Sequence, residues 1–424
     1  MDHLCICIFC YYYQLPGQVG YSLLKSNLEK DFAWTETDYA NIVVAFQFTY
    51  AVGLLLAEHF IDKIGTKIGY AFSLLIWSFS AVGHAFVQST VEFVVARGAL
   101  GISEAGNFPA AIKTVAEWFP KKERALATGI FNSGANIGAI AAPLTVPFIA
   151  AQRGWQWAFI ITGAIGFLWL IFWFWLYEIP DRKKELSKAE YDYIHSDADE
   201  ANETDKQADT GKVPWLRLLG VRQTWAFILG KFLTDPVWWF YLFWLPAFLQ
   251  AQYNVVGTAT ALPIALVYTM STIGSIFGGW LPLYFIRKGW QVYRSRKTAM
   301  LIYALCAVPV IFAQFLGSIN MWLAVLIIGL AAAGHQAWSA NIFTTVSDMF
   351  PKKAVGSVTG IGGMAGAVGG ILIAELAGML FDYYKVNGKI EAGYYIMFFI
   401  CEFAYIIAWL IMQLLAPKLQ RVNI

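Results

Sequence analysis

The chain has 424 residues, of which 58% are hydrophobic and 14% are charged, with a net charge of +2 and a mean hydropathy of +0.54. Soluble domains carry about a quarter charged residues, so this composition excludes a soluble globular protein and indicates a membrane protein. The small net charge argues against a nucleic-acid partner.

Twelve apolar segments follow one another along the chain, and each has the ~20 residues that a helix needs to span the hydrocarbon core. None of them alternates over ~10 residues as a β-barrel strand does. We therefore expect an all-α integral membrane protein with twelve transmembrane helices in two six-helix bundles. The expected spans are 4–24, 39–60, 68–88, 91–117, 125–151, 155–178, 224–249, 259–286, 298–317, 321–349, 354–382 and 392–415.

The first span lacks a basic start, so we do not expect a cleaved signal peptide. It holds Cys5, Cys7 and Cys10, but no matching His or Cys group follows that would complete a metal site. The sequence therefore predicts no metal and no cofactor.

The second span contains Gln47 and Tyr50, one helical turn apart within apolar sequence. Either a contact with substrate or a bridge between helices would explain them. The loop that follows reads Asp62-Lys63-Ile64-Gly65-Thr66-Lys67. Because it places opposite charges around a glycine, it suits a gating loop that latches helix ends together, with a solvated loop as the alternative.

The fourth span is the richest in ionisable side chains, which cost about 2.5–3.5 kcal/mol at mid-membrane on insertion scales and are therefore functional candidates. Arg97 and Glu104 are two helical turns apart, so both project from one face, with Asn107 just beyond. We interpret Glu104 as a carboxylate that takes up a proton beside a cation, Arg97, that binds an anionic substrate. A structural ion pair that locks helices together is the alternative.

In the fifth span, Asn132 and Asn136 lie one turn apart, and Asn132 is a candidate substrate contact. The longest polar stretch, 179–223, follows the sixth span and has too few apolar residues for a core of its own. It predicts a cytoplasmic linker, with a weak amphipathic helix, between an N-terminal bundle (1–178) and a C-terminal bundle (224–424).

The second half carries its own polar side chains within apolar spans. Lys231 lies four residues before Asp235, so the two either pair with each other or leave Lys231 to neutralise a substrate carboxylate. The tenth span holds His335, Gln336, Trp338 and Asn341. Amide groups bind sugar hydroxyls and Trp338 could stack on a sugar face. His335 is either a titrating group or a packing residue.

The two halves are related by an internal repeat. Phe-Pro-Lys-Lys occurs at 119–122 and again at 350–353, an offset of 231 residues. The same offset pairs Gly129 with Gly360 and Glu104 with His335. Repeats of this length are how transporter folds are built, so the two bundles are expected to be pseudo-symmetric.

The distribution of basic residues predicts the orientation. With the amino terminus inside, the cytoplasmic loops hold twenty-two of the thirty Lys and Arg residues, and the outer loops hold five. Such a bias places both termini in the cytoplasm.

These residues resemble those of the major facilitator superfamily and, within it, of the anion:cation symporters of sugar acids, such as bacterial hexuronate and galactonate transporters. The resemblance covers nearly everything from Leu24 to the end. It is carried by the 62–67 loop and, more specifically, by residues 101–113, 117–124 and 155–160. It implies a central cavity between two bundles, rocker-switch alternating access, and Glu104 as the proton-coupling carboxylate with Arg97 as its partner.

The first helix departs from this pattern. Members of the family carry an Asn-Tyr-x-Asp-Arg run there, whose Arg and Tyr contact the substrate, whereas this chain has Tyr13-Gln14-Leu15-Pro16-Gly17-Gln18. Permissible codons for Met1 to Val19, read one nucleotide later, encode the missing run, so we hypothesise a frameshift in this segment. The hypothesis fails if no single-base change in genomic DNA restores the run. Made as written, Pro16 would weaken the helix and impair coupled transport.

The sequence thus predicts a monomeric secondary transporter of the bacterial inner membrane that imports a sugar-acid anion, hexuronate or aldonate, with a proton or sodium ion. The alternatives are a transporter of another organic anion or of phosphate, and a transport-impaired product of a frameshifted gene. A membrane sensor would need an output domain that the 179–223 linker does not offer. We expect no enzyme, because the sequence shows no nucleophile, metal cluster or polar triad near an interface.

Overall fold

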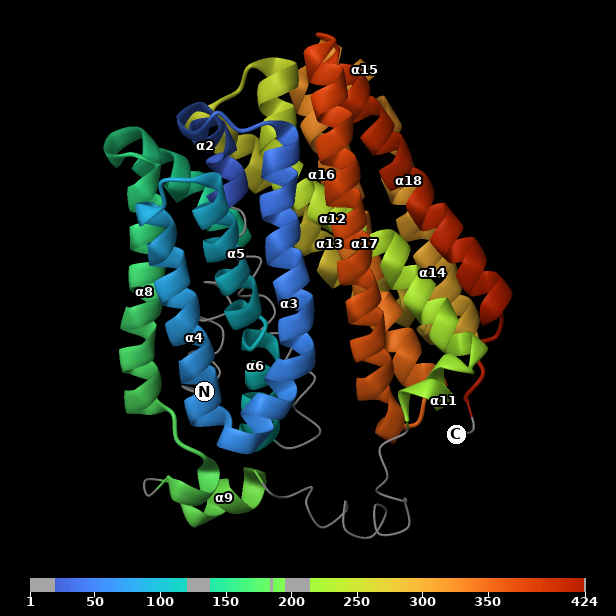
Figure 1. The fold of residues 1–424 in the computed structure, drawn as a ribbon. Coiled ribbons are helices and arrows are strands. Elements are labelled where there is room, and N and C mark those ends of the chain that lie inside the picture. The colour runs from blue at the N-terminus through green and yellow to red at the C-terminus, as the bar shows by residue number, and fades with distance from the viewer. Residues whose placement is uncertain (1–19, 120–137, 184–185, 195–213, 423–424) are drawn as a thin grey trace.

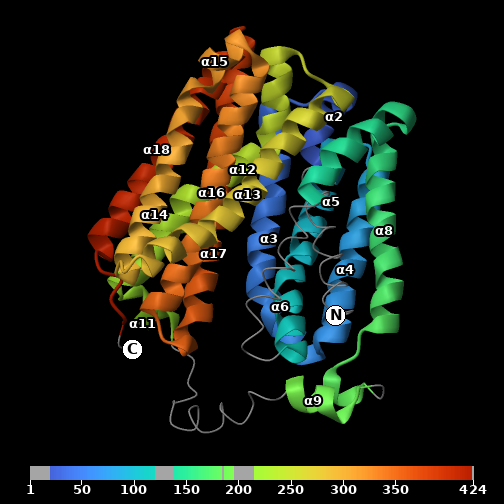
Figure 2. The same cartoon turned by 180° about the vertical axis from the view of Figure 1, so that it is seen from behind.

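The computed structural model describes residues 20–119, 138–183, 186–194 and 214–422, and these residues are almost entirely helical. Figures 1 and 2 show two groups of helices side by side. The first group consists of α2 (Lys25–Phe32), α3 (Glu36–Ile64), α4 (Thr66–Gly83), α5 (Thr90–Glu104), α6 (Asn107–Trp118), a helix over residues 138–153 and α8 (Trp155–Leu176).

The second group consists of α12 (Arg222–Tyr253), α13 (Ala261–Arg287), α14 (Val292–Ala307), α15 (Ala313–Ile319), α16 (Met321–Met349), α17 (Lys352–Val386) and α18 (Ile390–Leu415). Short helices α9 (Lys188–Ile194) and α11 (Trp215–Leu219) lie between the groups in the chain. They mark one end of the molecule, here called the α9 end. The opposite end, where α2 and α15 lie, is the α2 end (Figure 1).

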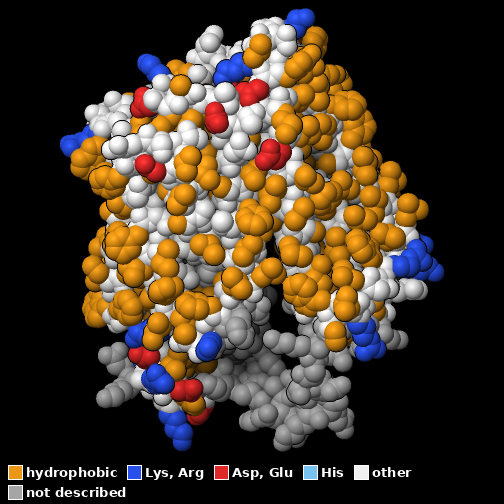
Figure 3. Space-filling model, viewed as in Figure 1, with side chains coloured by type: hydrophobic (Ala, Val, Ile, Leu, Met, Phe, Trp, Pro, Cys, Tyr) orange, Lys and Arg blue, Asp and Glu red, His pale blue; other side chains and the backbone are white. Residues whose placement is uncertain are grey.

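Eight helices of the described residues are long and apolar enough to cross a membrane. The expected first span and the segment for which a frameshift is hypothesised fall largely on residues that the structure does not describe, and the expected fifth span is described only from residue 138 on. The expected seventh span is α12, which carries Lys231 and Asp235 along its length. On the face seen in Figure 3, apolar side chains cover the middle and charged side chains gather toward the two ends, as a bilayer requires.

The expected fourth span is divided into two helices, α5 and α6. Pro109 lies in the first turn of α6, where a backbone N–H has no partner within the helix, so its missing N–H costs no hydrogen bond. Its ring would clash with the carbonyl of Ala105 in a continuous helix, and the helix is therefore interrupted before Asn107. The chain therefore turns at residues 105–106, directly after Glu104. This break places Glu104 at the end of α5 and Asn107 at the start of α6.

The two groups meet where α3 runs antiparallel to α17. At the α2 end, the Asp382 carboxylate accepts hydrogen bonds from the backbone N–H groups of Glu36 and Thr37, both at 2.8 Å. One turn further in, a Cβ on Gly378 would lie 2.5 Å from Cβ of Ala40. The helices are therefore in backbone-close contact from the α2 end toward the middle of the molecule.

Candidate functional site

Arg97 lies in α5 and is completely buried. Its guanidinium carbon is 4.3 Å from the ring centre of Tyr21 and 4.8 Å from that of Phe46 on α3. None of its three guanidinium nitrogens has a hydrogen-bond partner among the described residues. The cation is thus held by two aromatic rings, while all of its N–H donors remain unused.

This arrangement has a direct chemical meaning. A buried charge is normally paired, because an unpaired one forfeits the solvation it had in water. A guanidinium presents its donors in a planar fork that matches a carboxylate or phosphate. The aromatic rings fix the plane of that fork before any anion arrives, so Arg97 has the features of a preorganised anion site.

Glu104, on the same helix, is also completely buried. Its carboxylate lies within electrostatic range of the Arg97 guanidinium. Asn107 accepts a 2.5 Å hydrogen bond from the Tyr70 hydroxyl through its side-chain oxygen. The coupling role of Glu104 and Arg97 and its alternative, a structural ion pair, both stay predictions.

The two candidates on α3 occupy different surroundings. Gln47 is 1% exposed, and neither its amide nitrogen nor its amide oxygen has a hydrogen-bond partner among the described residues. Tyr50 is half-buried and stacks on Phe46, with ring centres 5.8 Å apart. Tyr50 therefore supports the ring that contacts Arg97, while Gln47 has an unmet capacity to bind a polar group.

In the second group, Lys231 and Asp235 form an ion pair at 2.7 Å within α12. The Lys231 ammonium also lies 4.4 Å from the ring centre of Phe343 on α16. The pairing that the spacing allowed is thus present. A role for Lys231 with substrate would require an anion to compete with Asp235.

The four candidates on α16 divide into buried and accessible residues. His335 is within 2.5 Å of the Tyr405 hydroxyl through Nδ1, and it stacks on Trp238 at 5.2 Å. Asn341 donates to the carbonyls of Gly278 and Ala337, at 2.6 and 2.9 Å. Trp338 is fully buried, whereas Gln336 is half-buried. Asn341 and His335 therefore have protein partners in this conformation.

The predicted gating loop is mostly helical. Lys63 belongs to the last turn of α3, as does the backbone of Asp62, and only Gly65, with a φ of 86°, separates α3 from α4. Lys67 pairs with Glu178, beyond the end of α8, at 2.8 Å. This hydrogen bond lowers the pKa of Glu178, so the pair persists below the ordinary range of a glutamate and is lost as pH falls through the lowered pKa. Asn132 lies outside the described residues.

Two residues that hold Arg97 escaped sequence reasoning. Tyr21 and Phe46 come from segments distant from Arg97 in the chain, and no spacing rule connects them to it. Sequence reasoning also missed Glu402 on α18, which is 1% exposed and has one carboxyl oxygen with no hydrogen-bond partner among the described residues. An acidic residue within the apolar twelfth span was the signal that could have identified it.

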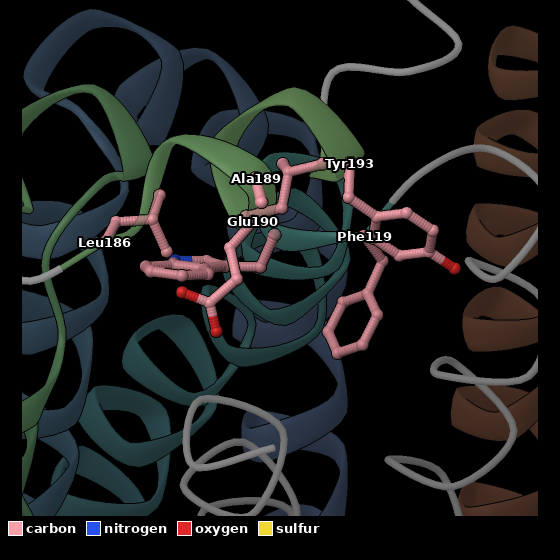
Figure 4. A pocket seen from close by; sticks show the side chains of 7 residues that line it. Phe119, Leu186, Ala189, Glu190 and Tyr193 are labelled. Carbon is pink, nitrogen blue, oxygen red and sulfur yellow. The ribbon is translucent and has the colours of Figure 1, made fainter.

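A cavity of about 350 Å³ lies apart from these residues, between α9 and the end of α6 (Figure 4). In Figure 4 the side chains of Leu186, Ala189, Glu190 and Tyr193 come from α9 or the residues just before it, and that of Phe119 from the end of α6. The cavity contains none of the predicted transport residues. It therefore belongs to the packing of the linker against the first group.

Comparison with known proteins gives a consistent result. Residues 4–374 match the Major Facilitator Superfamily model. The chain is 34% identical to a hexuronate transporter of Escherichia coli strain K12, over 81% of this chain and 79% of that protein. It is also 34% identical to a galacturonate transporter of Dickeya chrysanthemi, over 61% of this chain and 74% of the relative.

Solved structures share the fold at low sequence identity. A D-xylose-proton symporter superposes with a TM-score of 0.76 at 15% identity, covering 100% of this chain and 99% of that one. A bacterial homolog of the human lysosomal transporter Spinster, inward-facing and occupied, gives a TM-score of 0.76 at 16% identity, covering 98% and 96% of the two chains. The predicted all-α membrane fold is therefore confirmed.

Proposed function

Because the chain belongs to the major facilitator superfamily, we propose that it imports a sugar-acid anion by proton symport with alternating access. The single observation that supports this most strongly is Arg97, a buried guanidinium with no hydrogen-bond partner among the described residues. A substrate carboxylate would supply the missing acceptors. The relatives that transport hexuronate and galacturonate make a hexuronate the first choice of substrate and an aldonate the second.

In this mechanism Glu104 carries the proton and Arg97 holds the anion. The two lie on one helix, so the charge on either biases the state of the other. An arriving carboxylate offsets the positive charge of Arg97, which favours protonation of Glu104. Substrate and proton are therefore taken up together, and the loaded, neutralised site favours the switch between outward-open and inward-open forms.

The orientation and division of the chain are part of the same proposal. The α9 end faces the cytoplasm with both termini, because the Lys- and Arg-rich loops lie there. Residues 1–178 and 224–424 form the two moving bundles, with 179–223 as the linker. Gln47, Tyr50, Asn107, Asn132, Lys231, His335, Gln336, Trp338 and Asn341 are the candidate contacts for substrate, and Asp62, Lys63, Gly65 and Lys67 form the gating loop.

Uptake of labelled galacturonate into vesicles tests the proposal. We expect Glu104→Gln to abolish accumulation driven by a pH gradient while galacturonate exchange survives. A glutamine side chain mimics the protonated carboxyl group but can neither release nor take up a proton. Glu92→Gln, an exposed carboxylate on the same helix, is the matched control and should accumulate substrate normally. Unchanged accumulation in Glu104→Gln would remove Glu104 from the coupling role.

The substrate class is tested in the same vesicles by competition. Unlabelled galacturonate, galactonate, a simple monocarboxylate and phosphate are added in turn to wild-type protein. Inhibition by the sugar acids alone supports the proposal. Equal or stronger inhibition by phosphate or the simple monocarboxylate would replace the sugar acid with that anion.

A further inference from the structure

Three helices meet at one point in the middle of the molecule, at Gly370 on α17. A Cβ on this glycine would lie 2.8 Å from Cδ1 and 3.2 Å from Nε1 of Trp239 on α12. It would also lie 3.2 Å from Nε2 of Gln47 on α3. The indole N–H edge of one group of helices and the amide of the other therefore converge, and only the absence of a side chain at Gly370 leaves them room.

The amide at this junction is chemically incomplete. Gln47 is 1% exposed, and within the part of the chain that the structure describes both its nitrogen and its oxygen lack a hydrogen-bond partner. Buried polar groups in proteins are nearly always hydrogen-bonded, so an orphan of this kind needs an explanation. Trp239 is half-buried and its ring is held nearly parallel to Phe243, with centres 5.8 Å apart and planes at 8°.

We propose that Gln47 and Trp239 form a hydroxyl-binding subsite that determines specificity for the ring of a sugar acid. The Gln47 amide offers both a donor and an acceptor, and the indole offers a donor, which together match a sugar hydroxyl. The inference rests on the proposed function, because it assigns the hydroxyl-bearing part of the same substrate whose carboxylate Arg97 binds.

The position of the subsite relative to Arg97 follows from the α3 helix. Phe46, which contacts the Arg97 guanidinium, directly precedes Gln47, so the two side chains leave α3 at nearly the same level and in different directions. A ligand at that level meets the guanidinium on one side and the amide on the other. The carboxylate and the hydroxyls of one sugar acid thus have separate partners.

The location also connects recognition with movement. Gln47 and Gly370 belong to the surface along which α3 and α17 are in contact, and this surface separates when the α2 end opens. Separation uncovers the amide and the indole to the entering sugar. If the protein closes with sugar bound, the sugar hydroxyls form hydrogen bonds with the Gln47 amide and the Trp239 indole. If it closes empty, these groups have no such partner, so the subsite favours closure around the correct substrate.

The test compares galacturonate with tetrahydropyran-2-carboxylate, which has the same ring and carboxylate but no hydroxyls. Binding of each to the purified full-length protein is measured by ligand-induced thermal stabilisation. Wild type should prefer galacturonate. Gln47→Leu and Trp239→Phe should each reduce that preference about tenfold or more, since a site built for a hydroxyl loses discrimination with its partner group. Trp225→Phe, on an exposed part of α12, should preserve it.

The test distinguishes failure of the subsite from failure of the proposed function. If wild type binds galacturonate and the variants lose affinity for both ligands equally, or for neither, the subsite is overturned while sugar-acid transport stands. If wild type shows no preference for galacturonate over the analogue, the subsite and the assignment of a sugar acid both fail. Gly370→Ala gives a second measure of the subsite, and it should weaken the binding of galacturonate more than the binding of the analogue.

Discussion

Arg97 shows how a membrane protein keeps a cation ready for an anion. A guanidinium stays protonated in proteins, so burial cannot relieve its charge by removing a proton. The ring faces of Tyr21 and Phe46 supply part of the missing attraction, typically about 2 kcal/mol when desolvated. They leave the in-plane N–H groups unoccupied. The aromatic contacts thus stabilise the empty site without competing with the substrate.

This geometry predicts the effect of Arg97→Lys, which keeps the charge but loses the planar fork and the stacking. We expect the half-saturating concentration for galacturonate to rise about tenfold or more, because tenfold corresponds to about 1.4 kcal/mol. Initial uptake rates at several substrate concentrations measure it. Arg153→Lys is the control, since Arg153 lies 5.7 Å from the Trp157 ring on an exposed surface. An unchanged half-saturating concentration would contradict the anion-site assignment.

At the residue scale, local spacing predicted some features of the site. The i, i+4 separation of Lys231 and Asp235 allowed the ion pair that the structure contains, and the mid-membrane rule selected Arg97 and Glu104. The groups that surround them could not be predicted from the sequence. The contact of Arg97 with Tyr21, and the convergence of Gln47 and Trp239 on Gly370, depend on how distant helices cross.

At the scale of whole elements, close packing depends on single glycines. Helices α13 and α16 run parallel, and a Cβ on Gly278 would lie 2.5 Å from Cα of Ala337. One turn earlier, a Cβ on Gly274 would lie 2.5 Å from Cα of Ala333. Small residues at such positions let helix backbones approach in membranes, where no hydrophobic force drives them together.

Adjacent glycines give a matched test of this packing. We expect Gly278→Ala to lower the free energy of unfolding by about 1–3 kcal/mol, because the added methyl group overlaps the α16 backbone. Gly279→Ala should be neutral or slightly stabilising, since no described residue outside its own turn of α13 lies within 4 Å of its Cβ position. Thermal unfolding in detergent compares the two. Equal midpoints would show that α13 and α16 adjust without cost.

Elements were more predictable than contacts, because hydropathy over ~20 residues reports burial in lipid directly. Eight expected spans match described helices that meet this criterion. The fourth did not form one helix, since Pro109 interrupts it beside Glu104. In the predicted gating loop only Gly65 lies outside a helix, because α3 continues through polar residues such as Lys63 beyond its apolar part.

At the scale of the whole molecule, polar contacts between the two groups lie at the α2 end in the part of the chain that the structure describes. Asp382 caps the start of α3, and Glu36 receives a 3.0 Å contact from Lys385 on α17. Tyr39 donates a 2.9 Å hydrogen bond to the carbonyl of Phe243 on α12. Under the proposed orientation this is the outer side, so these contacts close the transporter toward the exterior.

Removing the cap should therefore shift the equilibrium toward the outward-open form. We expect Asp382→Ala to raise the labelling rate of a cysteine at Ala40, opposite Gly378, by a membrane-impermeant maleimide several-fold in a cysteine-free background. Glu391→Gln, an exposed residue at the start of α18, is the control and should leave the rate unchanged. A rate unaffected by Asp382→Ala would mean that this carboxylate does not hold the exterior closed.

The arrangement around Glu36 has a consequence for turnover. Lys25, which belongs to the same group of helices, contacts Glu36 at 2.7 Å, and the α3 start keeps its own capping box between Thr35 and Asp38. Lys385 is already about half exposed. When the two groups of helices part, Glu36 keeps its ion pair with Lys25 and α3 keeps the Thr35–Asp38 capping box. The Asp382 carboxylate and the N–H groups of Glu36 and Thr37 exchange their partners for water. These contacts can therefore be broken and remade in every cycle at little cost.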